Sequence, residues 1–112
     1  MTIKRGDVFF ADFPGPEGHV QGARKRPWVV VQNDVGNEHS PCTIVVPMTT
    51  KFKRPLPTHA IVMWGPVHGV IMCEQIRTVD KKNYQVVAHL PDEIMCHVDR
   101  ALAIAVGVTK EW

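Results

Sequence analysis

Three consecutive cations, Arg24, Lys25 and Arg26, precede Pro27 and a run of strand-forming residues. Pro27 fixes its own φ and favours an extended conformation for Arg26, so we expect Arg26 at the beginning of a strand. A cation held where a loop meets a strand is well placed to bind a negatively charged ligand. The same pattern also fits a solvated basic loop that caps a core strand, and the stretch alone favours this simpler interpretation.

A wider set of polar side chains falls at expected strand ends and in loops: His19, Arg26, Thr49, His59, Glu74, Gln75 and Arg77. Cleavage of RNA without a metal needs a base for the 2′-hydroxyl, stabilisation of the phosphorane charge and a proton for the leaving 5′-oxygen. A guanidinium offers forked donors that match phosphate, a threonine hydroxyl adds a hydrogen bond, and histidine or glutamate could act as the base. The set is sufficient for this chemistry but weakly specific, because most small domains contain such residues.

RNA binding would also need positive charge and flat side chains on which bases stack. A second basic stretch, residues 51–54, could converge with residues 24–26 into a cationic patch for a phosphodiester. Phe52, His59 and Trp28 are stacking candidates, although Trp28 is expected first as a core residue. The net charge of +2 does not by itself identify a nucleic-acid-binding protein.

The length of 112 residues suits one hydrophobic core and is too short for two, so we expect a single domain over residues 1–112. Hydrophobic residues make up 45% and charged residues 21%, a globular composition. The first residues carry charge where a signal peptide needs its apolar segment, and no run approaches the length of a membrane span. These features predict a cytoplasmic location.

Common signatures of cofactor, metal and hydrolase sites are absent from the sequence. It contains no GxGxxG or Walker loop, no HExxH and no GxSxG. The three cysteines are widely spaced, and neither they nor the six histidines show metal-ligand spacing. We therefore expect no cofactor and no metal ion, and cysteines that behave as small buried hydrophobes.

Short apolar runs between turn signals predict strands at residues 8–13, 28–32, 43–48, 58–64, 69–76 with an extension to 80, and 85–89. Pro47 suggests that the third strand lies at an edge of the sheet or ends there. Turn-forming residues fill positions 33–41, where we expect an irregular connection.

Residues 91–93, a proline and two acids, begin the only helix that the pattern predicts. Proline suits the first helical position, and the acids favour the positive end of the helix dipole. One apolar face follows from Ile94, Val98, Ala101, Leu102 and Ala105, and Gly107 is a plausible end. Short strands with one C-terminal helix predict a mainly β fold, a small and strongly bent antiparallel sheet or barrel.

The sequence resembles the MazF/PemK family of toxin endoribonucleases from bacterial toxin–antitoxin modules. The segments that carry the resemblance are residues 4–12, 21–22, 26–27, 31–34, 47–49, 56–59 and 74–80. The resemblance implies an SH3-like antiparallel β-barrel with a C-terminal helix, acting as a homodimer. It also implies metal-independent cleavage of single-stranded RNA to 2′,3′-cyclic phosphate and 5′-hydroxyl ends, which inhibits translation and growth, and a cognate antitoxin that lies across the RNA groove.

Carried onto this chain, the resemblance implies that Arg26 and Thr49 are the catalytic pair. Another branch of the family uses a histidine, an arginine and an acid; His19 and Glu74 match two of those places, but Met72 stands where the arginine would be. The remaining RNA-binding candidates are Arg24, Lys25, Thr50, Phe52, Lys53, His59, Gln75 and Arg77.

Two assignments stay open. The loop before Pro27 is richer in cations than the family pattern, so Arg24 could take the role of Arg26. Arginine stays protonated at ordinary pH, so Arg26 suits a phosphorane stabiliser and proton donor, and the base could be His19, Glu74 or a solvent hydroxide.

Two other functions are compatible with such a domain. A non-enzymatic toxin of the same fold could bind a protein such as gyrase, although residues 110–112 do not match the C-terminal tail that such toxins use. An RNA-binding module without activity would show salt-dependent binding and intact RNA.

Overall fold

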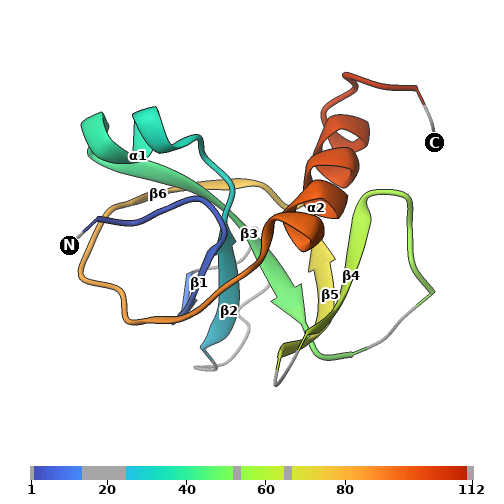
Figure 1. The fold of residues 1–112 in the computed structure, drawn as a ribbon, viewed down its shortest axis with the longest axis horizontal. Coiled ribbons are helices and arrows are strands. Elements are labelled where there is room, and N and C mark those ends of the chain that lie inside the picture. The colour runs from blue at the N-terminus through green and yellow to red at the C-terminus, as the bar shows by residue number, and fades with distance from the viewer. Residues whose placement is uncertain (1, 14–24, 52–53, 65–66, 111–112) are drawn as a thin grey trace.

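The computed structural model describes residues 2–13, 25–51, 54–64 and 67–110, which form seven strands and two helices (Figure 1). The strands are β1 (Asp7–Ala11), β2 (Arg26–Val30), β3 (Cys42–Thr49), β4 (His59–Trp64), β5 (Val67–Met72), β6 (Arg77–Asp80) and β7 (Val86–His89). The helices are α1 (Asp34–His39) and α2 (Asp92–Ala105).

The sheet is antiparallel at every described pairing and is organised around β3, its longest strand. The strand order is β4-β5-β3-β2-β1-β7, with β6 also beside β3. β3 pairs with β2 along one side, and with β6 and then β5 along the other. The sheet bends between these two neighbours into a half-barrel, with α2 lying against it (Figure 1). The predicted small antiparallel barrel with a C-terminal helix is therefore confirmed.

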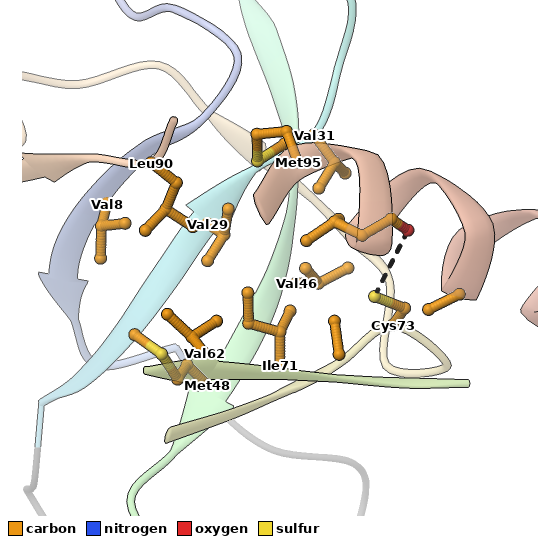
Figure 2. Packing of buried hydrophobic residues seen from close by; sticks show 13 residues of the cluster. Val8, Val29, Val31, Val46, Met48, Val62, Ile71, Cys73, Leu90 and Met95 are labelled. Carbon is orange, nitrogen blue, oxygen red and sulfur yellow. Dashed lines mark hydrogen bonds between the residues drawn. The ribbon is translucent and has the colours of Figure 1, made fainter. Parts of the chain in front are cut away.

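Alternating side chains of the strands supply two buried clusters, one on each face of the sheet. The larger cluster lies between the strands and α2, where Val29, Val46, Ile71 and Met95 gather (Figure 2). The second contains Phe9, Trp28, Val30 and Val45, with Phe13 and Tyr84 packed against it. Trp28 is only 5% exposed, so it belongs to the core, as its first interpretation predicted, and does not offer a face to a nucleobase.

Helix α2 follows the predicted pattern with a small rotation. Met95, Val98, Ala101 and Ile104 are buried, while Ile94 and Leu102 pack at the margin of the larger cluster. The helix ends in a Schellman arrangement: the N–H of Val108 donates to Ala103 O and that of Gly107 to Ile104 O, with Gly107 at φ 80° as its missing Cβ permits. Pro91 is the N-cap, one position before the first helical turn where it was predicted. Within the described residues, no helix is long and apolar enough to cross a membrane.

The prediction of an irregular connection over residues 33–41 was wrong, because α1 forms there. Asn33 caps it by accepting the N–H of Gly36 at 2.8 Å, and Asp34 occupies the first turn. Asn37 is buried and accepts hydrogen bonds from Thr43 Oγ1 and Gln32 Nε2 while donating to Gln32 O. Residues that favour turns also favour helix caps, and a six-residue helix is too short to show a period.

Pro47 lies neither at a sheet edge nor at a strand end. It pairs with Trp28 of β2 inside a strand that continues to Thr49. On the other side of β3, the pairing with β6 extends only as far as Val45, and the pairing with β5 begins at Met48. Pro47 therefore falls in the gap between two partners, where a missing N–H costs no ladder hydrogen bond on that side.

The predicted long strand over residues 69–80 is two strands separated by a turn. β5 and β6 both run antiparallel to β3, but Val45 pairs with Arg77 and Met48 with Ile71. From one pair to the other, β3 advances by three positions while the segment from β5 to β6 advances by six. The extra residues form the turn at Cys73–Gln75, which is closed by a hydrogen bond from the N–H of Gln75 to Met72 O. The turn places Glu74 and Gln75 outside the ladder.

Candidate functional site

Arg26 and Thr49 stand at neighbouring strand ends. The β2–β3 ladder pairs Val30 with Val45 and Trp28 with Pro47. Arg26 and Thr49 each lie two residues beyond the last of these pairs, so they continue the same register, at the beginning of β2 and the end of β3 (Figure 1). Strand alternation directs both side chains to the face that carries Trp28. Both residues are half-buried.

The hydroxyl of Thr49 is oriented by the turn that follows β3. Its Oγ1 accepts the N–H of Lys51 at 3.2 Å. A hydroxyl has one proton to donate besides its acceptor lone pairs. While its oxygen accepts the N–H of Lys51, the Thr49 hydroxyl is still able to donate its proton. Thr50 and Lys51 are exposed beside it.

Arg77 brings a second guanidinium to the same face. It pairs with Val45, and its Cζ lies 5.9 Å from the centre of the Trp28 ring and 5.8 Å from that of Phe13, both within the range of cation–π attraction. Trp28 is itself fixed, because its Nε1 donates to Ala11 O at 3.1 Å. The sequence prediction named Arg77 but missed Phe13, which ended an expected strand and carried no other signal.

His59 and Glu74 form a second group at the beginning of β4 and in the turn after β5. His59 Nε2 lies 3.1 Å from Glu74 Oε2, and Glu74 Oε1 accepts the hydroxyl of Thr58 at 3.2 Å. His59 Nδ1 accepts the N–H of Leu56 at 3.2 Å, so its proton is on Nε2 and points to Glu74. Both oxygen atoms of Glu74 are thus engaged within the protein.

A depression of about 340 Å³ adjoins this group. Its lining comes from the segment before and along β4 and from α2, and consists of Pro55, Pro57, His59, Ala60, Ile61, His97, Arg100 and Ala101. Apolar surface with histidine and arginine at its walls suits a ligand that has both flat apolar groups and negative charge.

The structure describes most of the predicted RNA-binding residues. Lys25 and Thr50 are exposed beside Arg26 and Thr49, and Gln75 is exposed in the turn next to Glu74, its Nε2 3.6 Å from Met72 Sδ. The predictions for His19, Arg24, Phe52 and Lys53 fall outside the described residues. The described candidates thus form two groups, one around Arg26, Thr49 and Arg77 and one around His59 and Glu74.

Comparison with known proteins gives a consistent set of relatives. The family model described as PemK-like, MazF-like toxin of type II toxin-antitoxin system matches residues 4–106. The chain is 44% identical over 114 residues to Endoribonuclease EndoA of Bacillus subtilis (strain 168), covering 96% of this chain and 97% of that protein.

Solved structures agree with the sequence match. A mycobacterial endoribonuclease in complex with its cognate antitoxin superposes with a TM-score of 0.78 at 27% identity, covering 96% of this chain and 97% of that one. A MazE–MazF complex from Deinococcus radiodurans superposes with a TM-score of 0.77 at 21% identity, covering 97% and 99%, and shows that the fold is shared.

Proposed function

The chain belongs to the PemK-like, MazF-like family of toxins of type II toxin–antitoxin systems, and from this premise we propose that it is an endoribonuclease that cleaves single-stranded RNA without a metal ion. Residues 1–112 act as one toxin domain in the cytoplasm, where cleavage of mRNA inhibits translation and growth. EndoA, the Bacillus relative, is named for the same activity. That name favours RNA cleavage over the alternative of a non-enzymatic toxin that binds gyrase.

The proposal is supported chiefly by the shared register of Arg26 and Thr49 at the ends of β2 and β3. In the proposed reaction the 2′-hydroxyl loses its proton and attacks the adjacent phosphorus, and the bond to the 5′-oxygen breaks. The guanidinium of Arg26 stabilises the added phosphorane charge and donates a proton toward the leaving oxygen, and Thr49 donates a hydrogen bond to a phosphoryl oxygen. The products are a 2′,3′-cyclic phosphate and a 5′-hydroxyl.

Glu74 is a poor choice for the general base. Its two oxygens already accept hydrogen bonds from Thr58 and His59, so proton abstraction would compete with contacts that join two turns. His19 or solvent hydroxide remains for this step. Glu74 and His59 then serve to shape the surface that receives a base or the backbone beside the scissile phosphate.

The RNA path we propose runs from the polar residues beside Arg26 and Thr49, past Arg77, to the turn that carries Gln75. Lys25, Thr50, Gln75 and Arg77 lie along the described part of this path, and Arg24, Phe52 and Lys53 are proposed to extend it. Cations along a backbone path make binding weaken as salt rises, because condensed counterions are released. The path does not require bases to stack on Trp28.

We further propose a homodimer and a protein antitoxin that competes with RNA. The mycobacterial relative was solved in complex with its cognate antitoxin, and the Deinococcus relative as a MazE–MazF complex. An antitoxin that covers the Arg26–Thr49 end of the sheet would protect RNA by occupying the same cationic surface.

The test is incubation of purified protein with a long RNA of mixed sequence in excess EDTA, followed by mapping of the new 5′ ends. Cleavage at a short recurrent sequence, with 5′-hydroxyl ends that need phosphorylation before ligation, is expected. Arg26→Ala is expected to abolish it, and Arg24→Ala, in the same assay, decides between the two arginines. Cleavage by Arg26→Ala at the rate of the unmodified protein, or intact RNA with gyrase inhibition instead, would contradict the proposal.

A further inference from the structure

Gly69 lies in β5 where that strand passes the end of β3. A Cβ placed on Gly69 would be 2.7 Å from the carbonyl oxygen of Thr49, 2.9 Å from Met48 Cγ and 3.1 Å from Met48 Sδ. The first two distances are too short for any side chain without movement of a neighbour. Gly69 is not among the described glycines with positive φ, which are Gly6 and Gly107, so space and not backbone conformation requires glycine here.

The atoms around Gly69 differ in how easily they can move. β5 is held from its other side by six consecutive pairs with β4, from His59–Met72 to Trp64–Val67. Met48 is 4% exposed and is packed in the larger core beside Val62 and Ile71 (Figure 2). The end of β3 is less constrained, because its pairing with β5 stops at Thr49–Val70 and an exposed bend follows. A side chain at position 69 would therefore displace Thr49.

We propose that Gly69 is a positioning residue for the reaction, because its missing side chain lets β3 approach β5 closely enough to fix where Thr49 presents its hydroxyl to Arg26. This inference rests on the proposed role of Thr49. Gly69 touches the backbone of Thr49 and acts on the substrate only through it. A shift of the Thr49 carbonyl also moves Oγ1 and the N–H of Lys51 that orients it.

The experiment compares Gly69→Ala with the unmodified protein in steady-state cleavage of one short RNA that contains the mapped site. We expect kcat to fall by about 100-fold, the scale of an ångström-sized misplacement of a catalytic group, with KM changed by less than about threefold. The amide resonances of Thr49 and Lys51 should shift in the NMR spectrum of the variant. A residue needed only for folding would lower the active fraction without moving these resonances in the folded molecules.

Gly107→Ala is the matched control. It adds the same methyl at a described glycine with φ 80°, where the new Cβ would have no heavy atom within 4 Å apart from those of the adjacent residues. Gly107 follows α2, whose end lies far from the tip of β3 (Figure 1). It lowers stability through the backbone, and kcat per folded molecule should stay within about twofold of the unmodified protein. If both glycine variants lose activity in proportion to their melting temperatures, the positioning role is refuted.

Two further variants keep the test decisive. If Gly69→Ala does not fold, the same change is made in a Met48→Ala background. The new methyl then occupies space that the Met48 side chain has vacated, and only its contact with Thr49 O remains. The double variant should still show the drop in kcat relative to Met48→Ala alone. Thr49→Ala in the same assay separates the two hypotheses. Loss of activity in Thr49→Ala with full activity in Gly69→Ala refutes the role of Gly69, whereas full activity in Thr49→Ala refutes the proposed site.

Discussion

His59 at the beginning of β4 contacts Glu74 in the turn after β5, with His59 Nε2 3.1 Å from Glu74 Oε2. The side chain of His59 is 10% exposed and that of Glu74 33%, so the contact is partly shielded from water. The backbone N–H of Leu56 donates a hydrogen bond to His59 Nδ1, which favours the tautomer whose Nε2 proton is donated to Glu74. The pair therefore orients the segment before β4, which lines the depression beside α2.

Replacement of Glu74 by alanine should weaken RNA binding more than chemistry. His59 would lose its partner and Thr58 its acceptor, so we expect KM to rise severalfold, kcat to stay within about threefold, and stability to fall by about 1–2 kcal/mol. Glu38→Ala is the control, because Glu38 also neighbours a histidine, His39, but with side chains 69% and 72% exposed. A loss of kcat of a hundredfold or more, on the order of general-base removal, would instead identify Glu74 as the base.

Thr49→Val should remove the hydroxyl while keeping the shape of the side chain. A single donor to a developing oxyanion is worth about 100- to 1,000-fold in kcat, so we expect a loss of that size with little change in KM. Thr49→Ser keeps the hydroxyl and should retain most of the activity. Steady-state cleavage of a short RNA measures both variants, and equal rates for valine and threonine would show that the hydroxyl does no chemistry.

The regular part of this fold was predictable because it rests on local patterns. The β-branched run before Gln32 and the apolar spacing in α2 both report directly on which side chains are buried. Pro47 and α1 were not predictable in this way. Whether a proline lies at a sheet edge depends on which strands pair with its neighbours. Whether residues 34–39 form a turn or a helix depends on the hydrogen bonds of Asn37 with Gln32 and Thr43.

In the candidate site too, features set by local sequence were predictable and features set by strand pairing were not. Arg26 could be placed at a strand beginning because Pro27 acts locally. The alignment of Arg26 with Thr49 depends on the β2–β3 register. Arg77 contacts Phe13 and Trp28 and pairs with Val45, which come from three separate segments of the chain. Gly69 gave no signal at all, since a glycine needed for space looks like any other in the sequence.

Asn37→Ala should be among the more destabilising changes at a position away from the site. Asn37 is 2% exposed and bonds to Gln32 and Thr43. Its removal leaves the buried hydroxyl of Thr43 without its acceptor, while Gln32 Nε2 keeps only its bond to Cys42 O. We expect a loss of about 2–4 kcal/mol in urea unfolding. Cleavage per folded molecule should not change. A loss below 0.5 kcal/mol, the usual surface range, would mean that water replaces these bonds.

Cys73 should make stability depend on pH in the alkaline range. Its side chain is fully buried and its thiol lies 3.9 Å from Val98 O (Figure 2). Burial first, and then the nearby carboxylates of Glu74 and Asp99, raise the pKa of the Cys73 thiol from 9.0 to about 12. Because the folded-state pKa is the higher one, the stabilisation is complete below about pH 9 and is lost as the pH rises toward 12.

The measurement is the free energy of urea unfolding from pH 7 to pH 11 for the unmodified protein, Cys73→Ala and Cys96→Ala. Other groups titrate in this range in all three proteins, so the informative quantity is the difference between variants. The advantage of the unmodified protein over Cys73→Ala should shrink above pH 9, because only the unmodified protein must keep a buried thiol protonated. Cys96→Ala is the control for the loss of a cysteine side chain at an exposed position. A constant difference between the unmodified protein and Cys73→Ala across the range would show that the thiol ionises in the folded state as readily as in the unfolded chain.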